Sequence, residues 1–191
     1  RGHDVHILTR RLPSHQSDCD MIQNVREWRY TVNHSNAFTF FASTLRNCKK
    51  LFEKLGKTNN FDCINFHQPF SAFAVLRSDS CKKIRKIYTC HSLAFEEYAS
   101  RNAKTHSFFK RIVYSSHLAS RKWIEKKVLN QTDLIIVLSR YTLDKLQNIY
   151  GIPDGKIEVI PGGIDLVRFH PAFDKRALRE RLHLPQEKTI L

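Results

Sequence analysis

Two histidines stand directly after short runs that predict strands, where a side chain can face a ligand. His67 follows the run 62–66, and His91 follows the run 84–90. An imidazole changes charge near neutral pH, so it can move a proton or bind a hydroxyl or an anion. A single histidine at the end of a strand is more often a surface or capping residue. A catalytic interpretation therefore needs support from other residues of the chain.

A second group lies near the C-terminal end, in Val159–Asp165. A β-branched run enters Pro161, which fixes φ and ends a strand. Gly162 and Gly163 can adopt positive φ or let a ligand approach the backbone closely. Asp165 can cap the turn that follows.

Upstream, the run Asp133–Ser139 predicts a buried strand that ends in a helix-capping serine. Together with the stretch Val159–Pro171, this run resembles glycosyltransferase family 4, which has the GT-B fold. The family pattern is an acid-led apolar strand ending in serine, a helix, and then V-x-P-N/G-G-x-D-x-x-x-F-x-P. Both stretches match in order and spacing. A weaker likeness is Arg1–Val5, which resembles the family's G-H-x-V entry to its second strand.

The resemblance implies a Rossmann-like N-terminal half of a two-domain enzyme that lacks its first βα unit and its second domain. Residues 1–165 are then an incomplete acceptor-side domain. Residues 166–191 are the interdomain linker, a helix and the start of the donor domain, with 188–191 as its opening strand.

The resemblance also implies roles for single residues. Thr89-Cys90-His91-Ser92 fits the family's setting for a histidine that holds the donor sugar and orients the acceptor hydroxyl, so His91 is the candidate catalytic residue. Implied acceptor contacts are His67, Ser92 and Arg121, and the donor side of the cleft is assigned to Ser139, Gly162, Gly163 and Asp165.

Competing interpretations stay open for two of these residues. Ser92 could instead cap the next helix. Arg121 shares a helix face with Glu125 and is expected to form a surface salt bridge rather than to contact a phosphate. Glu125 itself fits a structural glutamate eight residues before Asp133.

Periodicity along the chain predicts an α/β fold, because strands alternate with helices. This alternation is typical of a doubly wound parallel sheet, whose ligands bind beyond the carboxyl ends of the strands. We expect His67, His91 and the glycine pair to converge there. The expected strands are 4–9, 22–30, 62–67, 84–90, 134–138 and 156–160, with a polar loop at 10–20. The expected helices are 37–55, 70–76, 95–129 with a candidate break at 115–116, 139–150 and 174–182.

The chain is strongly basic, with 32 Lys and Arg against 18 Asp and Glu and a net charge of +14. Its surface should attract nucleic acid, an anionic membrane or phosphate-bearing small molecules. The stretch 101–127 holds eight basic residues against one acid, together with Phe108, Phe109 and Trp123. Such a helix suits an anionic membrane, or else it packs on the sheet. Nucleic acid is disfavoured because no binding motif for it is present.

Metal binding and disulfides are not expected. Asp18-Cys19-Asp20 has the form of the GT-A metal motif, but a loop precedes it instead of a strand. The five cysteines form no Cys-x-x-Cys pair, which indicates reduced thiols and a cytoplasmic location, with peripheral attachment to the inner membrane face as an option. No apolar run approaches the ~18 residues needed to span a bilayer.

The function that the resemblance implies is sugar transfer with retention of configuration and without a metal or cofactor. The donor would be a nucleotide-sugar, and the acceptor a saccharide, a lipid-linked sugar or a small molecule. We expect the chain alone to be inactive, because the family's charge-neutralising residues belong to the second domain. The alternatives are a GT-B nucleotide-sugar epimerase, a non-enzymatic membrane-docking module and a nucleic-acid-binding module.

Overall fold

The computed structural model describes residues 2–15, 17–102 and 108–189, and only the backbone of residues 108–110. It divides the chain into two compact units, Arg1–Pro161 and Gly162–Leu191. The predicted domain boundary after residue 165 stays a prediction. The two units are described separately below.

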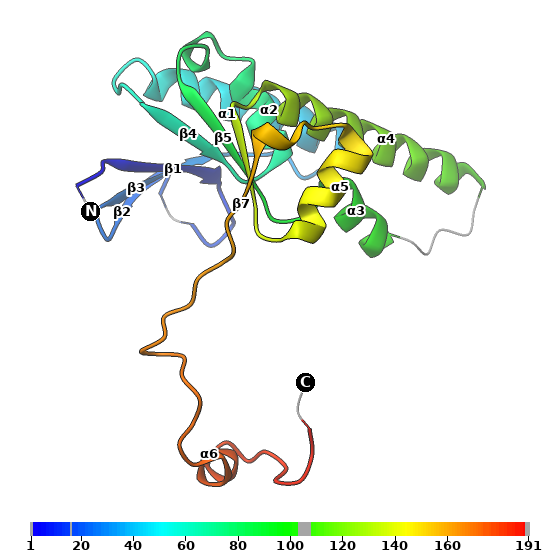
Figure 1. Cartoon of the computed structure of the whole chain (residues 1–191). Helices are drawn as coiled ribbons and strands as arrows, with labels where there is room; N and C mark the ends of the chain where they lie inside the picture. Colours follow the sequence, from blue (N-terminus) through cyan, green and yellow to red (C-terminus); the bar gives the residue numbers. More distant parts are fainter. Residues whose placement is uncertain (1, 16, 103–107, 190–191) are drawn as a thin grey trace. The chain divides into compact units, whose positions relative to one another are not determined.

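A four-stranded parallel sheet forms the centre of the first unit (Figure 1). Its strands, in sheet order, are β4 (Cys63–Phe66), β5 (Arg85–Cys90), β6 (Leu134–Val137) and β7 (Ile157–Val159). All three pairings are parallel, as the alternation of strands and helices predicts. The inner strands are the most apolar, and Tyr88, Ile135 and Val137 on them are almost fully buried. The α/β prediction is confirmed.

A second, smaller sheet lies at the N-terminal end and corrects part of that prediction. It contains β1 (Val5–Arg10), β2 (Cys19–Ile22) and β3 (Val25–Tyr30) in the order β1-β3-β2. β1 and β3 are parallel, whereas β2 and β3 are antiparallel. The extended segment expected over 22–30 is confirmed from Val25 onward but is interrupted by a turn at residues 23–24, and the loop expected over 10–20 is wrong only at its end, because β2 begins at Cys19. Gln23 and Asn24 adopt left-handed φ values of 49° and 66°, and this tight turn folds the chain back into a hairpin.

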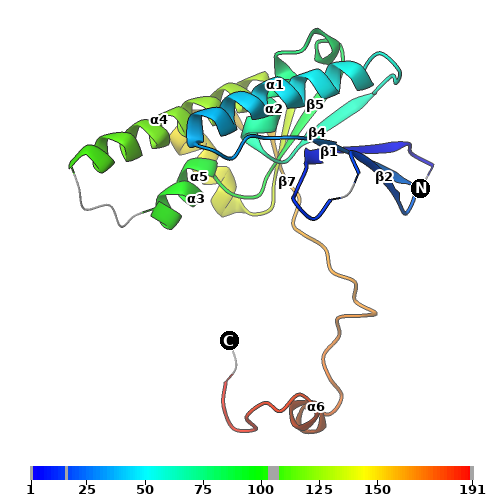
Figure 2. The same ribbon diagram turned by 180° about the vertical axis from the view of Figure 1, so that it is seen from behind.

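Helices cover both faces of the parallel sheet. Figures 1 and 2 show α1 (Ala37–Leu55) and α2 (Pro69–Leu76) on one face, with α5 (Arg140–Tyr150) on the other. α2 also packs against α4 (Phe108–Gln131), which in turn contacts α3 (Ala94–Asn102). Short 3₁₀ turns lie at Asp79–Cys81 and Asp154–Lys156.

Local capping explains where two of these helices begin and end. Asn36 and Thr39 form a reciprocal capping box at the start of α1. Ser139 accepts a hydrogen bond from the Thr142 amide at the start of α5, as predicted, and α5 ends at Gly151, whose φ of 69° is left-handed.

The helix expected over 95–129 is in fact two helices. α3 ends at Asn102 and α4 begins at Phe108, while the candidate break at Ser115 and Ser116 does not occur. α4 continues through both serines, and the Ser116 hydroxyl donates to the Ile112 carbonyl at 3.0 Å. This bond satisfies the hydroxyl within the helix.

The second unit contains one short helix, α6 (Lys175–Arg181). Asp174 caps it, as predicted, by accepting from the amides of Arg176 and Ala177. Of the strand expected over 188–191, residues 190 and 191 lie outside the described residues, and 188–189 are not in a strand.

Candidate active site at the carboxyl ends of the parallel strands

The structure brings His67 and His91 into direct contact. His67 follows the last residue of β4 and His91 follows the last residue of β5, and these strands are neighbours in the sheet. His67 Nδ1 and His91 Nε2 lie 3.0 Å apart, and the two rings stack with their centroids separated by 5.3 Å. Below them, the Thr89 hydroxyl donates to Asn65 Oδ1 at 2.9 Å and ties the two strand ends together. Two residues 24 positions apart thus form one imidazole pair.

The pair constrains where protons can reside. A hydrogen bond between two ring nitrogens requires one to donate and the other to accept, so the bridge holds a single proton. Partial desolvation, followed by the charge of His91, lowers the pKa of His67. A second proton on the pair would place two like charges in contact. Both histidines are exposed to solvent. The pair can therefore exchange protons with a ligand that binds at this edge of the sheet.

Glu125 anchors the segment that carries His91. Its side chain is fully buried, and Glu125 Oε1 accepts from the Ala94 amide at 2.9 Å. The Tyr150 hydroxyl donates to Glu125 Oε2 at 2.5 Å. Burial raises the pKa of Glu125, although these hydrogen bonds and one from the Phe95 amide act in the opposite direction. One carboxylate therefore joins α4 to the start of α3 and the end of α5, which agrees with the structural role predicted for it.

Arg121 does not form the expected salt bridge with Glu125. Glu125 is turned into the core, whereas the Arg121 guanidinium lies over the ring of Phe70 at 4.9 Å and over the ring of Tyr98 at 4.4 Å. Its Nε is buried without a hydrogen-bond partner. Desolvation lowers the pKa of Arg121, yet the group remains a cation because arginine titrates far above neutral pH. The result is a cation held by aromatic rings, with no carboxylate against it among the described residues.

This arginine clamp lies against the elements that follow the two histidines. Phe70 is on the first turn of α2, three residues after His67, and Tyr98 is on α3, seven residues after His91. That the histidine pair and this cation face one ligand stays a prediction. Such a combination can bind a hydroxyl and an anionic group of one ligand.

The two predicted serines have partners of their own. The Ser92 hydroxyl donates to the Glu97 side chain on α3, and both the acceptor contact and the capping role of Ser92 stay predictions. Ser139 lies two residues past β6 and caps α5. Its hydroxyl also lies 3.1 Å from that of Thr142. Ser139 thus marks a helix N-terminus at the same end of the sheet as the histidines.

Gly162, Gly163 and Asp165 belong to the second unit, so their convergence with the histidines stays a prediction. Neither glycine has positive φ, and a Cβ at either would meet no atom within 4 Å. Asp165 caps a turn, as expected, because its Oδ1 accepts from the Val167 amide at 2.9 Å and the Arg168 amide at 3.2 Å. Left-handed backbone therefore does not explain why glycines stand at these two positions. Close approach of a ligand to the backbone is the explanation that remains.

No group of metal-ligating side chains occurs in the described ranges. Asp18 forms an ion pair with Arg11, and Asp20 forms one with Arg29, so the two carboxylates of the Asp-x-Asp sequence serve different arginines. The cysteines are free thiols, and burial raises the pKa of Cys90, which immediately precedes His91, to about 12. The Cys90 thiol is therefore protonated and unreactive at neutral pH.

Comparison with known proteins decides the family. A profile described as Glycosyltransferase Family 4 matches residues 1–168. The chain belongs to Glycosyltransferase Family 4. The family match agrees with the resemblance that the motifs at Asp133–Ser139 and Val159–Pro171 carry.

Relatives within this family share shorter stretches. A D-inositol 3-phosphate glycosyltransferase 2 of Catenulispora acidiphila is 34% identical over 67 residues, which are 35% of this chain and 16% of the relative. A GDP-mannose-dependent alpha-(1-6)-phosphatidylinositol monomannoside mannosyltransferase of Mycolicibacterium smegmatis is 31% identical over 91 residues, which are 43% of this chain and 24% of the relative. The matches therefore span less than a quarter of the length of either relative.

A solved structure supports the same fold. Sucrose-phosphate synthase from Thermosynechococcus elongatus, a GT-B glycosyltransferase, superposes with a TM-score of 0.72 at 21% identity. The match covers 97% of this chain and 44% of that one. The predicted GT-B architecture of this family member is confirmed.

Sequence reasoning missed the aromatic partners of the site. Phe70 and Tyr98 lie on different helices, and neither stands at a strand end, where ligand-facing residues of a parallel sheet are expected. The sequence nevertheless contains a signal. Once Glu125 is assigned to the core, no acid of the stretch 101–127 is left to pair with Arg121. In this family member, the cation is positioned by rings instead of by a carboxylate.

Proposed function

We propose that this chain is the acceptor-side part of an enzyme that moves a sugar from a nucleotide-sugar to an acceptor with retention of configuration and without a metal. The observation that supports this most strongly is the His67–His91 pair at the carboxyl ends of two neighbouring parallel strands. Ligands of open parallel sheets bind at that edge.

In this proposal, His91 holds the sugar being transferred and orients the acceptor hydroxyl. His67 contacts the acceptor and, through the 3.0 Å bridge, fixes which nitrogen of His91 carries a proton. Ser92 completes the acceptor side. Ser139, Gly162, Gly163 and Asp165 contribute to the donor side of the cleft.

Arg121 would bind an anionic group of the acceptor. Its guanidinium has no counter-charge among the described residues, and the rings of Phe70 and Tyr98 restrict its orientation. Two of the relatives are named as D-inositol 3-phosphate glycosyltransferases, that is, after a phosphorylated polyol. A phosphate-bearing small molecule is therefore the acceptor class that we favour over a neutral saccharide.

The donor step requires residues outside the described site. Charge on the departing nucleotide would be neutralised by basic side chains and by backbone amides at a helix N-terminus. Since the chain corresponds to 44% of the solved GT-B enzyme, we propose that transfer requires a second, donor-binding half and that the 191 residues alone transfer no sugar.

The test uses the full-length protein and a panel of nucleotide-sugars with phosphorylated and neutral acceptors. Replacement of His91 by alanine should lower turnover by roughly 10²-fold or more if this residue acts on the transition state. His170→Ala, an exposed histidine in the second unit, is the matched control and should leave turnover unchanged. Turnover that survives the His91 substitution would remove this residue from the mechanism.

A second proposal concerns α4, which we infer to dock on an anionic membrane, consistent with a cytoplasmic protein at the inner face. Ile112 and Trp123 are 51% and 54% exposed, and eleven residues, about three turns, separate them, so they share one helix face. Arg111 and Lys122 repeat the same spacing and are exposed. Trp123 packs its ring edge against Phe73 and still leaves half its surface open.

No helix in the described part of the chain is long and apolar enough to cross a bilayer. Of the residues expected to contribute to docking, the side chains of 103–110, including Phe108 and Phe109, lie outside the described part. The docking proposal therefore rests on Ile112, Trp123 and their basic neighbours, with each basic residue contributing about 1 kcal/mol near an anionic surface.

Vesicle sedimentation tests this proposal. Binding should rise with the anionic lipid fraction and fall with added salt, because counterions screen the attraction. Charge reversal at Arg111 and Lys122 should abolish it, whereas the same reversal at Lys83 and Arg85 should not. Equal binding to neutral and anionic vesicles would contradict the proposal.

A further inference from the structure

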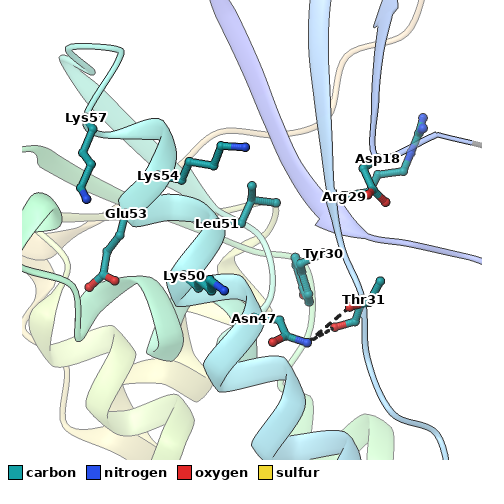
Figure 3. Close-up of a pocket in the computed structure, with 10 residues that line it drawn as sticks. All are labelled: Asp18, Arg29, Tyr30, Thr31, Asn47, Lys50, Leu51, Glu53, Lys54 and Lys57. Carbon is teal, nitrogen blue, oxygen red and sulfur yellow. Dashed lines mark hydrogen bonds between the residues drawn. The ribbon is translucent and has the colours of Figure 1, made fainter.

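A cavity of about 450 Å³ lies between α1 and the end of β3, apart from the histidine pair and the arginine clamp (Figure 3). Its volume falls in the range of small-molecule sites. The wall on the sheet side is formed by Tyr30 and Thr31. Asn47 Nδ2 donates to the Thr31 carbonyl at 2.9 Å, which ties α1 to this wall. The cavity is thus bounded by elements that are fixed to each other.

Three lysines at the C-terminal end of α1 line this cavity. Lys50 and Lys54 lie at positions i and i+4 of the helix, which places them on one face, and Lys57 lies in the turn that follows the helix end at Leu55. None of them forms an ion pair or a hydrogen bond through its ammonium group within the described residues. All three are exposed to solvent. Figure 3 shows Lys54 extending from α1 toward the strands.

The acids that border the cavity are already engaged. Glu53 lies 3.5 Å from the ammonium group of Lys49, and Figure 3 shows it pointing away from Lys54. Asp18 lies 2.7 Å from Arg11, and Arg29 is neutralised by Asp20 and Glu27. Arg29 and its two acids together carry one negative charge, so the three lysines leave a net local excess of two positive charges.

The helix dipole explains only part of this arrangement. Lysines are favoured in the last turn of a helix, which accounts for Lys54. Lys50 lies more than one turn before the end of α1 at Leu55, where the dipole effect has faded, and Lys57 lies beyond that end. The three ammonium groups together match a ligand that carries several negative charges.

We propose that this cavity is a binding site for a small, soluble anion with two or more phosphate or sulfate groups. Lys50 and Lys54 are separated by about 6 Å along the axis of α1, and Lys57 lies in the turn beyond its end, so the three positive charges are spread along the cavity instead of gathered at one point. A chain of linked phosphates matches this spread. The Thr31 hydroxyl on the opposite wall accepts from Asn47 Nδ2 at 3.4 Å and can still donate its own proton to a ligand.

Calorimetric titration of the chain with inorganic tripolyphosphate in low-salt buffer tests the proposal. A parallel titration with orthophosphate gives the affinity for a single phosphate group. Replacing the three cavity lysines with glutamine should weaken tripolyphosphate binding by about tenfold or more, because charge-assisted contacts are lost. The matched control carries the same change in net charge at three exposed lysines elsewhere, namely Lys83, Lys126 and Lys175. Its affinity should change by less than about twofold. Circular dichroism establishes that both triple variants are folded.

Four results would overturn the proposal. One is wild-type protein that binds no tripolyphosphate. Another is an equal loss of affinity in both triple variants, which would indicate attraction by net charge alone. A third comes from vesicles of phosphatidylglycerol and phosphatidylcholine: if the cavity variant loses vesicle binding and retains tripolyphosphate binding, these lysines serve a membrane instead. Tighter binding of orthophosphate than of tripolyphosphate would also contradict a site for linked anions. None of these experiments measures sugar transfer, so their outcome is independent of the proposed activity.

Discussion

Replacement of the buried glutamate should reveal how much the start of α3 depends on one side chain. In Glu125→Leu, the Ala94 amide and the Tyr150 hydroxyl lose the acceptors that they contact at 2.9 and 2.5 Å. A buried donor left without a partner costs roughly 1–3 kcal/mol, so the two together should cost about 2–6 kcal/mol of the free energy of unfolding. Glu125→Gln retains an acceptor for Ala94 and should cost less than about 1 kcal/mol at neutral pH.

The pH dependence separates the charge of Glu125 from its hydrogen bonds. Burial raises the folded-state pKa of Glu125 above the ordinary value of 4.5, so the folded protein binds this proton more tightly than the unfolded chain does. Stability from this group is therefore fully present below 4.5 and is lost as the pH rises through the folded-state pKa. Since glutamine does not titrate, the stability of Glu125→Gln relative to wild type should rise across that window and be constant outside it.

Urea unfolding, followed by circular dichroism and repeated from acidic to neutral pH, measures both effects. Glu158, an exposed acid on β7, provides matched controls in Glu158→Leu and Glu158→Gln, for which changes within about 0.5 kcal/mol are expected. The reasoning would be refuted by a Glu125→Leu variant as stable as wild type. A difference between wild type and Glu125→Gln that stays constant over the whole pH range would refute the electrostatic part alone.

Three further predictions concern the site and the helix ends. By imidazole NMR, the pKa of His67 should lie below 6.5 and should rise in His91→Ala, because one of the two causes of its depression is removed; an unchanged value would contradict the coupling. In the full-length enzyme, Arg121→Gln should raise KM for a phosphorylated acceptor by about 10- to 100-fold and leave KM for a neutral acceptor unaffected, and equal effects on both would exclude a phosphate contact. Gly151→Ala should destabilise the chain by about 1 kcal/mol in urea unfolding because its φ of 69° disfavours a side chain, whereas Gly155→Ala, with open space around it, should not.

Local signals predicted the parallel sheet and most helix ends, because each such feature depends on residues close together in the chain. Ser139 and Gly151 mark the two ends of α5 through capping chemistry that the sequence displays directly. The hairpin was missed because its turn consists of Gln23 and Asn24, and only the second of these commonly adopts left-handed backbone.

The partners of the charged groups were harder to predict. Arg121 and Glu125 have the spacing of a helix salt bridge, but the free energy of the site is set by contacts between distant segments. The Glu125 carboxylate is buried and binds the amide at the start of α3, whereas the Arg121 guanidinium packs on the rings of Phe70 and Tyr98. The contact between His67 and His91 followed from topology, since adjacent parallel strands place their next residues at one edge. Its hydrogen-bonded geometry did not, because side-chain rotamers depend on tertiary packing.

The order of the strands in the parallel sheet has a consequence for biosynthesis. β4, β5, β6 and β7 occupy the sheet in the same order as they occur in the chain. Each strand that leaves the ribosome therefore finds its partner already made, and no strand has to wait for a later one or insert between two earlier ones. Domains form from the N-terminal side as the chain is synthesised, so this sheet can grow by one edge at a time, with α5 and β7 closing it last. A ribosome stalled after residue 131 should expose a protease-resistant β4–β5 layer before β6 has been made.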